Sequence, residues 1–493
     1  MTRMISSPIA SDRAVSTCVL RGSVRRGLVV VTIALSVALG ASAAEEPQTD
    51  VRIASDGKGF VAIWKQGDFP AKLVLSRVSA KGVRLDETPV VVADNPGDAG
   101  IVFGGSSYLV LWTGRFSRIP FARRLSVDGS WLDEQPIAIP AADVYGLGAV
   151  WDCNRFFMVW AAGDRGVGGM FGAFLEANGK LTEAKKLSPQ ETYFEGGIPQ
   201  VLWNGRFFLV SWSVYVMCDP CGSRYMARSL RVSPEGEPLD LKTPWLLPDA
   251  SELQIRFASD GVSFLGLSDR VEGGSSFFAV ETGGERLQLG ALRRLFSWFT
   301  STASDWTWDG ASYVVASRFN ESFGLYRSTG RPWLSLTRLS SDGTVQSRLV
   351  MELTSIPLVT PQLAVNAIGD TVIAIAEVSP NGVWRIQFHI PDEMHPSPLP
   401  PDAPSVISAV KSGDKTRVLW TSTASEIDGF VFEDAPYRFN PYDRALLAVD
   451  SSTRSADVPT WLAPLLIRSF NSGGMSAAVP IVPAPVRQRV ARH

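Results

Sequence analysis

Short apolar runs alternate with tight-turn residues along most of the chain. The most regular feature is a turn followed by a strand-like run, such as Asp56–Gly57 before FVAIW (60–64) and Asn204–Gly205 before FLVSW (208–212). Asp-Gly and Asn-Gly favour hairpins, because those turns need the positive φ that Gly and Asn tolerate. Seven copies align, and their leading residues are Phe60, Tyr108, Phe156, Phe208, Phe264, Tyr313 and Val372. Spacings of 48, 48, 52, 56, 49 and 59 residues indicate an internal repeat.

A second hairpin follows in most copies, within RVSAKG (77–82), RLSVDG (124–129), RVSPEG (231–236) and RLSSDG (338–343). A short outer strand comes next, for example at 89–93 or 136–139. One unit therefore predicts four antiparallel strands, which in the first copy are 51–54, 60–64, 73–79 and 89–93. Four-stranded sheets at this period predict β-propeller blades, and seven copies predict seven blades. The absence of a long helical period excludes an α-solenoid.

The seventh copy lacks an outer strand after 384–390, so we expect residues 45–50 to supply it and to close the ring by strand exchange. The first four copies keep a Trp at the end of the aromatic-led run, at 64, 112, 160 and 212. The units resemble the degenerate propeller repeats of secreted bacterial proteins over about residues 45–397. This resemblance implies an all-β fold with a seven-bladed propeller at 44–397.

Composition changes at the proline-rich stretch 396–401, of which 398–401 is read as a stiff linker. The following residues 402–484 resemble a fibronectin type III domain. The matching pieces are Asp402-Ala403-Pro404, Val418-Leu419-Trp420, 429–433 and the late strand with its loop at 466–477. Such a domain is a β-sandwich of alternating strands. Leu465 stands where the family usually has a corner Tyr, so an irregular edge is expected there. Residues 485–493 form a basic tail.

Residues 1–43 have the pattern of a signal peptide. Arg21, Arg25 and Arg26 precede the apolar run 28–40, and Ala41-Ser42-Ala43 follows. Cleavage is expected after Ala43. The apolar run is shorter than the roughly 20 residues needed to span a bilayer, so no membrane insertion is expected after signal removal; an uncleaved N-terminal anchor is the alternative. The sequence thus predicts an exported protein, located extracellularly, at the cell surface or in the periplasm.

Signal removal changes the net charge from −2 to −6, which disfavours sequence-independent binding of nucleic acid. It also removes Cys18 and leaves three cysteines. The spacing of Cys218 and Cys221 in an exported chain predicts a small loop disulfide, with free thiols or metal or redox work as alternatives. Cys153 is expected to be a buried, unpaired thiol.

The residue types needed for several kinds of catalysis are scarce. Histidine occurs only at 389, 395 and 493, which leaves little material for a Ser-His-Asp triad or a His-rich metal site. Carboxylates near expected loops are plentiful, at Asp68, Asp143, Asp164, Glu195, Asp219, Asp269, Glu321 and Glu377, but they form no recurrent acid pair. We therefore assign no catalytic, cofactor-binding or metal-binding residue, and we expect no cofactor.

Two sets of residues recur at equivalent places in the repeat. Trp151, Trp203 and Trp308, with Phe103, fall at the ends of the predicted innermost strands, where they could stack on sugar rings or pack between blades. Their repetition favours packing. A second set, Arg77, Arg124, Arg231 and Arg338, precedes the second hairpin, and a shared structural contact explains it better than four ligand sites.

These observations predict an exported, non-enzymatic binding or scaffold protein. The propeller would be a platform for a carbohydrate or protein ligand, and the fibronectin-like module a spacer or attachment domain. The alternative is a carbohydrate-active hydrolase or lyase with its site at the propeller mouth. Propellers serve both purposes, so the fold alone does not choose between them.

Overall fold

The computed structural model describes the chain between residues 46 and 483 with gaps. The described ranges are 46–164, 167–188, 191–192, 199–216, 224–240, 245–246, 255–269, 275–281, 288–289, 293–294, 303–323, 327–341, 345–355, 360–397, 402–424, 427, 429–434, 445–459, 465–471, 474–476 and 479–483. The expected signal peptide, the linker 398–401, the basic tail and the pair Cys218 and Cys221 lie outside them. No helix within these ranges is long and apolar enough to cross a membrane.

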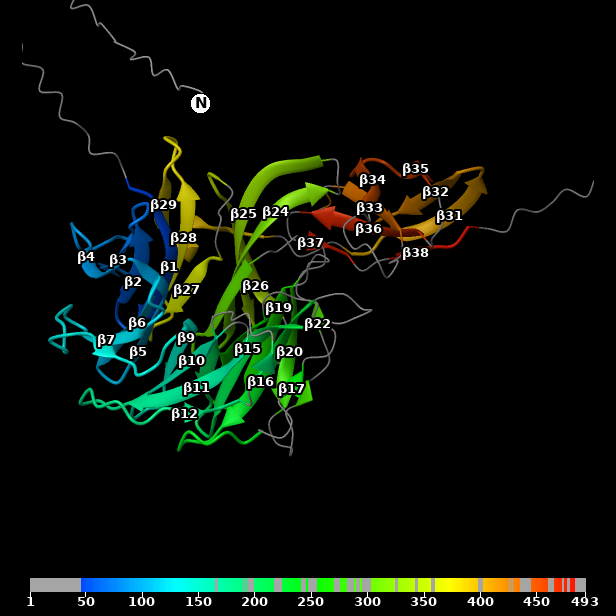
Figure 1. Ribbon diagram of the computed structural model, residues 1–493. Coiled ribbons are helices and arrows are strands. Elements are labelled where there is room, and N and C mark those ends of the chain that lie inside the picture. Colours follow the sequence, from blue (N-terminus) through cyan, green and yellow to red (C-terminus); the bar gives the residue numbers. More distant parts are fainter. Residues whose placement is uncertain are drawn as a thin grey trace, which may run out of the picture. The chain divides into compact units, whose positions relative to one another are not determined.

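The described chain is all-β, and its first part forms successive antiparallel sheets (Figure 1). The first sheet contains β1 (Gln48–Ser55), β2 (Phe60–Gln66), β3 (Lys72–Val78) and β4 (Val90–Asp94). The second contains β5 (Pro96–Gly104), β6 (Ser107–Gly114), β7 (Pro120–Ser126) and β8 (Ile137–Ala138). The third contains β9 (Val144–Trp151), β10 (Phe156–Asp164), β11 (Val167–Leu175), β12 (Lys185–Lys186) and β13 (Glu191–Thr192).

Four further sheets follow the same order. The fourth contains β14 (Gln200–Trp203), β15 (Phe208–Val216), β16 (Arg224–Val232) and β17 (Trp245–Leu246). The fifth contains β18 (Ile255–Ser259), β19 (Phe264–Asp269), β20 (Ser275–Glu281), β21 (Gln288–Leu289) and β22 (Arg293–Arg294). The sixth contains β23 (Ala303–Trp308), β24 (Tyr313–Phe323), β25 (Arg327–Leu339), β26 (Val345–Glu352) and β30 (His395–Pro396). The last contains β27 (Gln362–Val365), β28 (Thr371–Val378) and β29 (Trp384–His389), before the 3-10 turn η2 (Pro391–Glu393).

The turn between the first two strands of a sheet is built alike in several repeats. In the first sheet Asp56 Oδ1 accepts hydrogen bonds from the backbone N–H of Lys58 and Gly59, at 2.8 and 2.7 Å. Asp152, Asn204, Asp260 and Asp309 do the same in later sheets. The next residue has φ between 77° and 96° in these turns, which explains the recurrent Gly at this position.

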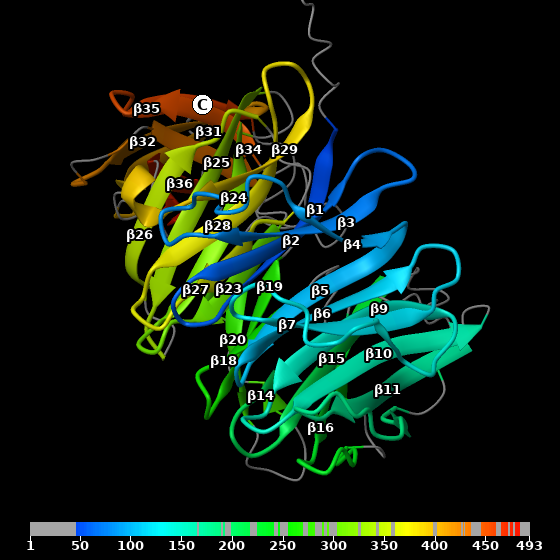
Figure 2. The same ribbon diagram turned by 90° about the vertical axis from the view of Figure 1, so that its left-hand side faces the viewer.

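The first strands of the seven sheets contact one another in the order β1, β5, β9, β14, β18, β23 and β27, and β27 contacts β1. Shared apolar clusters join most neighbouring sheets, and one of them joins the last sheet to the first. Figure 2 shows this stacking for β1 to β11. The aromatic-led runs supply the core: Trp64, Trp112, Trp160 and Trp212 are all buried. The prediction of an all-β, propeller-like chain with four-stranded antiparallel sheets is confirmed.

The expectation that residues 45–50 complete the last sheet is wrong. Residues 48–50 begin β1, which pairs with β2, and the last sheet has three strands among the described residues. Burial explains this placement, because Val51 and Ile53 of β1 both enter the core between the first and last sheets. The two sheets also meet through Gln48, whose Oε1 accepts the backbone N–H of Ile386 at 3.1 Å. Side-chain packing, rather than an exchanged strand, therefore joins them.

Residues 405–481 form two more antiparallel sheets. One contains β31 (Ser405–Ser412), β32 (Lys415–Thr421) and β35 (Ser455–Pro459). The other contains β33 (Gly429–Asp434), β34 (Ala445–Asp450), β36 (Leu465–Asn471), β37 (Gly474–Met475) and β38 (Val479–Ile481). They share one core around Trp420, whose ring lies edge-on to Phe430 and Phe432 at 5.3 and 5.1 Å. Leu465, which stands where a corner Tyr was expected, is buried in this core.

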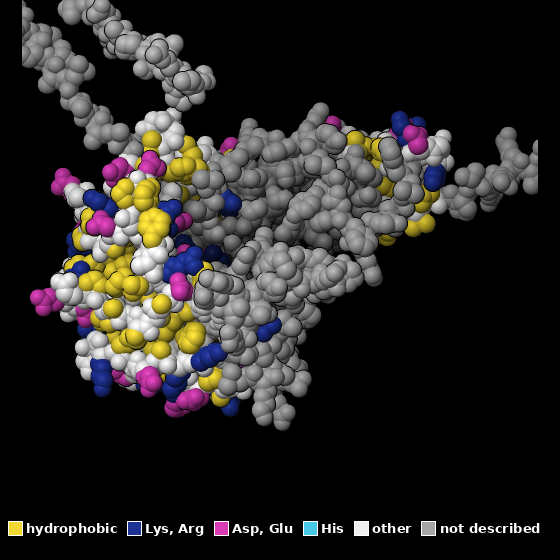
Figure 3. Space-filling view, viewed as in Figure 1, with side chains coloured by type: hydrophobic (Ala, Val, Ile, Leu, Met, Phe, Trp, Pro, Cys, Tyr) yellow, Lys and Arg dark blue, Asp and Glu magenta, His cyan; other side chains and the backbone are white. Residues whose placement is uncertain are grey.

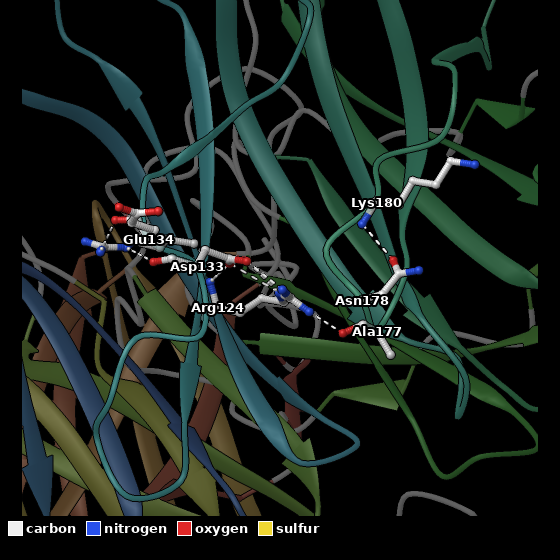
Figure 4. A network of polar contacts seen from close by, with 7 residues as sticks. Arg124, Asp133, Glu134, Ala177, Asn178 and Lys180 are labelled. Atoms are coloured by element: carbon white, nitrogen blue, oxygen red, sulfur yellow. Dashed lines mark hydrogen bonds and ion pairs between the residues drawn. The ribbon is translucent and has the colours of Figure 1, made fainter.

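The recurrent arginines form clamps within and between sheets. Arg124 Nη2 contacts Asp133 Oδ1 at 2.5 Å, and its Nη1 donates to the Ala177 carbonyl in the hairpin of the next sheet (Figure 4). Arg77 and Arg231 pair in the same way with the acid nine residues later, at 2.6 and 2.7 Å. Arg338 differs, because it pairs with Asp309 in the first turn of its own sheet. The predicted shared structural contact is therefore confirmed for the first three.

The buried clamp leads to a prediction about stability. The Arg124 and Asp133 side chains are only 9% and 10% exposed, so removing one charge leaves the other buried without its partner. Asp133→Asn should lower the free energy of unfolding by on the order of 3 kcal/mol. Asp94→Asn, at an exposed carboxylate, is the control and should change it little. Equal denaturant midpoints for the two variants would contradict the clamp.

Cys153 corrects another expectation, because its thiol is exposed rather than buried. It occupies the Gly position of the repeated turn with φ of 77°, where a Cβ is strained. Cys153→Gly should raise the free energy of unfolding by about 0.5–1 kcal/mol. Cys153→Ala removes the thiol but keeps the Cβ, so it should not stabilise. Thermal melts under reducing conditions would compare them, and a stabilised Ala variant would show that the thiol, not the backbone, is responsible.

Candidate functional site

Six residues occupy one equivalent level of the innermost strands. Each of them pairs across the first hairpin with the residue three positions after the leading aromatic. They are Arg52, Gly100, Gly148, Gln200, Arg256 and Asp305. Because the innermost strands contact one another around the ring, residues from six sheets meet at this level. The sheets share no common residue type at this level, which holds two arginines, an acid, an amide and two glycines.

Two polar side chains at this level tie neighbouring sheets together. Gln200 Oε1 accepts the backbone N–H of Phe257 in the fifth sheet at 2.9 Å. Asp305 Oδ2 accepts the backbone N–H of Leu363 in the last sheet, also at 2.9 Å. The other oxygen of Asp305 contacts Arg256 Nη1 at 3.0 Å. The side-chain oxygens of Gln200 and Asp305 thus accept backbone N–H groups of two innermost strands. On that side an innermost strand has no neighbouring strand in its own sheet to accept them.

Arg52 is half-buried and has no such partner. Its Nη1 donates to the Val51 carbonyl at 2.8 Å, and no carboxylate within the described ranges lies at ion-pair distance. Burial lowers the pKa of Arg52, and the positive charge of Arg256 lowers it further, while Asp50, Asp305 and Asp98 oppose the change. The pKa of Arg52 on the first sheet is thus influenced by charged groups on the second, fifth and sixth sheets.

Asp98 completes what we call the central cluster, namely Arg52, Asp98, Arg256 and Asp305. Burial raises the pKa of Asp98, although Lys65 and Arg52 oppose this change. Its equivalent in the first sheet, Asp50, is engaged by Lys65 Nζ at 2.8 Å. Asp98 thus differs from Asp50 in having no ion-pair partner among the described residues.

Exposed aromatic and arginine side chains lie at the end of the ring where β1 and β5 begin. Phe69 and Phe116 follow β2 and β6, are 63% and 74% exposed, and lie edge to face with centroids 5.7 Å apart. Arg115 stacks over Phe69 at 5.5 Å, and Arg118 over Tyr145 at 4.3 Å. We call these five residues the rim cluster. Figure 3 shows hydrophobic side chains among charged ones over the region of the first sheets.

The rim cluster is close to the central cluster along the strands. Gln48 of β1 pairs with Gln66, and Pro96 of β5 pairs with Gly114, so both strands start beside the loops that carry the exposed phenylalanines. Asp98 is two residues beyond Pro96, and Arg52 is four residues beyond Gln48. We therefore treat the rim and the central cluster together as the candidate site. The sequence analysis missed it because its residues do not recur in most copies of the repeat, and only the shared register reveals it.

The predicted stacking aromatics lie at the opposite ends of the innermost strands and are not brought together. Trp151, Trp203 and Trp308 each pack on the leading aromatic of their own sheet, with centroids 4.5–4.8 Å apart. Trp151 also lies on the preceding sheet, where a Cβ at Gly104 would come within 2.3 Å of its ring. All three are half-buried, and Phe103 packs likewise on Tyr108. These contacts account for the repetition, and a role in ligand stacking stays a prediction.

Glu377, one of the acids expected near loops, has a different environment in the structure. It lies in β28, is buried, and its Oε1 is 2.7 Å from His389 Nε2. Thr354 Oγ1 donates to its other oxygen at 2.8 Å, and His389 Nδ1 is 3.2 Å from Glu393. Burial alone would lower the pKa of His389, but the two carboxylates beside it raise that pKa overall. Burial alone would raise the pKa of Glu377, but His389 and Thr354 lower that pKa overall. Within the described ranges, no group of three or more His, Cys, Asp or Glu is arranged to hold a metal ion.

Comparisons with solved structures find β-propeller proteins. The β-propeller domain of the Trilobed protease from Pyrococcus furiosus is 8% identical, with a TM-score of 0.40, covering 71% of this chain and 97% of that one. A polysaccharide lyase, the PL25 ulvan lyase, is 10% identical, with a TM-score of 0.45, covering 70% of this chain and 94% of that one. An acylaminoacyl peptidase from Pyrococcus horikoshii is 10% identical, with a TM-score of 0.41, covering 80% and 59%. No protein-family model and no curated protein matches the sequence.

The Glu377–His389 pair predicts a pH-dependent contribution to stability. The raised pKa of His389 stabilises the fold below about pH 6.5, and this contribution is lost as the pH rises through the folded-state pKa. The lowered pKa of Glu377 stabilises the fold above about pH 4.5, and this contribution is lost on acidification. His389→Gln should therefore lower the melting temperature more at pH 5.5 than at pH 8.5. His395→Gln, at an exposed position, is the control. A pH-independent loss for His389→Gln would contradict the ion pair.

Proposed function

We propose that this chain is an exported binding protein, in which a seven-bladed propeller recognises a carbohydrate through the rim cluster and a fibronectin type III-like module acts as a spacer or attachment domain. The seven sheets and the contact between β27 and β1 support the blade count. Two sheets around the buried Trp420 support the module. Export rests on the signal-like pattern of residues 1–43 alone.

The exposed Phe69–Phe116 pair is the observation that carries the proposal. Large aromatic side chains are normally buried, and two of them in contact on the surface beside arginines offer apolar faces to sugar rings. Arg115 and Arg118 keep the rings oriented and add donors for hydroxyl groups. A protein partner would use the same aromatic and arginine contacts, so a protein ligand is the other outcome of the test.

A hydrolase or lyase at this mouth is the second candidate, and Asp98 is the observation in its favour. A carboxyl group whose pKa is raised by burial suits a general acid. Asp50, at the equivalent position of the preceding sheet, could supply the second carboxylate that glycoside hydrolysis needs. Its ion pair with Lys65 would have to open first.

Binding to a polysaccharide panel tests the proposal. Phe69→Ala with Phe116→Ala should weaken retention of the retained glycan at least tenfold, since each aromatic contact is worth on the order of 1 kcal/mol. The control is Val262→Ala with Ile368→Ala, two exposed apolar residues in the first hairpins at the other end of the innermost strands. Equal retention by both double variants, or retention of a protein instead of any glycan, would reject carbohydrate recognition at the rim. Reducing-end or unsaturated product release that Asp98→Asn abolishes would establish the enzyme.

A further inference from the structure

The charges of the central cluster are unevenly satisfied. Asp305 is committed to Arg256 and to the backbone N–H of Leu363, and Asp50 is committed to Lys65. Arg52 keeps a single hydrogen bond, to the neighbouring Val51 carbonyl. A guanidinium carries five N–H donors, and a charged group that is partly removed from water needs a counter-charge. The cluster therefore presents an arginine fork that no carboxylate of the described chain contacts at ion-pair distance, although Asp50, Asp98 and Asp305 are near enough to raise its pKa.

Room for a ligand exists beside this fork. Gly100 is at the level of Arg52 on the adjacent strand β5, and a Cβ placed on it would meet no atom within 4 Å. Gly148, at the same level of the next strand, is different, because a Cβ there would come within 2.5 Å of the Pro199 carbonyl. Close packing thus explains Gly148, whereas Gly100 borders open space.

We propose that Arg52, with Arg256 at the same level of the innermost strands, binds the carboxylate or sulfate group of an acidic ligand in the space beside Gly100. Arg is suited to both groups because its planar fork matches two oxygens at once. The inference rests on the proposed function for the rest of the ligand, since the rim aromatics would hold the sugar ring that carries the acid. An acidic polysaccharide and a small free anion offer the same chemistry to Arg52.

Asp98 is the group that could oppose this ligand. Its carboxylate would repel an anion, but burial favours its neutral form, which can donate a hydrogen bond instead. The remaining charged neighbours are already paired, Arg256 with Asp305 and Lys65 with Asp50. Binding of an anion should therefore weaken when Asp98 ionises. Acid binding is therefore expected to tighten as the pH falls, as long as the acid of the ligand stays ionised.

Calorimetric titration of the mature protein tests the inference with tetragalacturonate, with the matching neutral galactotetraose, and with sodium sulfate. We expect the uronate to bind at least tenfold more tightly than the neutral sugar. Arg52→Gln should abolish that preference. Lys72→Gln removes the same charge at an exposed position and should preserve it. Gly100→Leu fills the space without changing any charge and should also abolish it. Melting curves of each variant confirm that it is folded, so a misfolded Arg52→Gln leaves Gly100→Leu to decide.

The outcomes separate this inference from the proposed function. No preference for the uronate, or equal preference in Arg52→Gln and Lys72→Gln, overturns the anion site while rim binding of the neutral sugar can persist. Loss of all sugar binding on changing Phe69 and Phe116, with sulfate binding retained and dependent on Arg52, keeps the anion site and assigns it to a small free anion. Uronate binding that survives both Arg52→Gln and Gly100→Leu rejects the central location.

Discussion

Each sheet of the repeat has two apolar faces, and neither can be covered from within the same sheet. This constraint governs the first seven sheets, because a blade is stable only when a neighbour lies on each side. The shared clusters satisfy it from one sheet to the next, and the cluster around Val51, Ile53 and the last sheet satisfies it where the array meets its own beginning. Side chains such as Gln48 contribute to that junction without an exchanged strand. The arginine clamps add polar contacts at the outer hairpins.

Packing the sheets in this way brings together residues that are distant in sequence. Arg52 and Arg256 are on the first and fifth sheets, yet the charge of one affects the pKa of the other. Gln200 and Asp305 meet the backbone of the following sheet, which shows that polar side chains at this level compensate inner-strand donors. Arg52 and the space beside Gly100 remain after these structural needs are met. They are therefore the features at the centre of the ring that point to a ligand.

Repetition separates structural residues from candidate functional ones. The tryptophans at 151, 203 and 308 and the clamp arginines recur, and the structure gives each of them a packing or ion-pair partner. The residues of the rim and central clusters do not recur in most sheets, and their exposed rings and unpaired charge have no structural explanation. His389 shows that the number of histidines in the chain does not decide whether one of them is engaged by charged groups. Three histidines in the chain argued against histidine chemistry, yet one of them lies between two carboxylates.

The sequence by itself determined the strand pattern, the turn chemistry and the repeat, because these depend on local alternation and on residues that tolerate positive φ. It also indicated a shared structural contact for the four recurrent arginines, which holds for Arg77, Arg124 and Arg231 but not for Arg338. Tertiary structure alone decided that residues 48–50 begin an inner strand, that Glu377 is buried against His389 and that Cys153 is exposed. It alone brought Asp98, Arg256 and Asp305 near enough to Arg52 to influence its pKa. Such placements depend on which sheets meet, and contacts between residues hundreds of positions apart leave no local pattern in the chain.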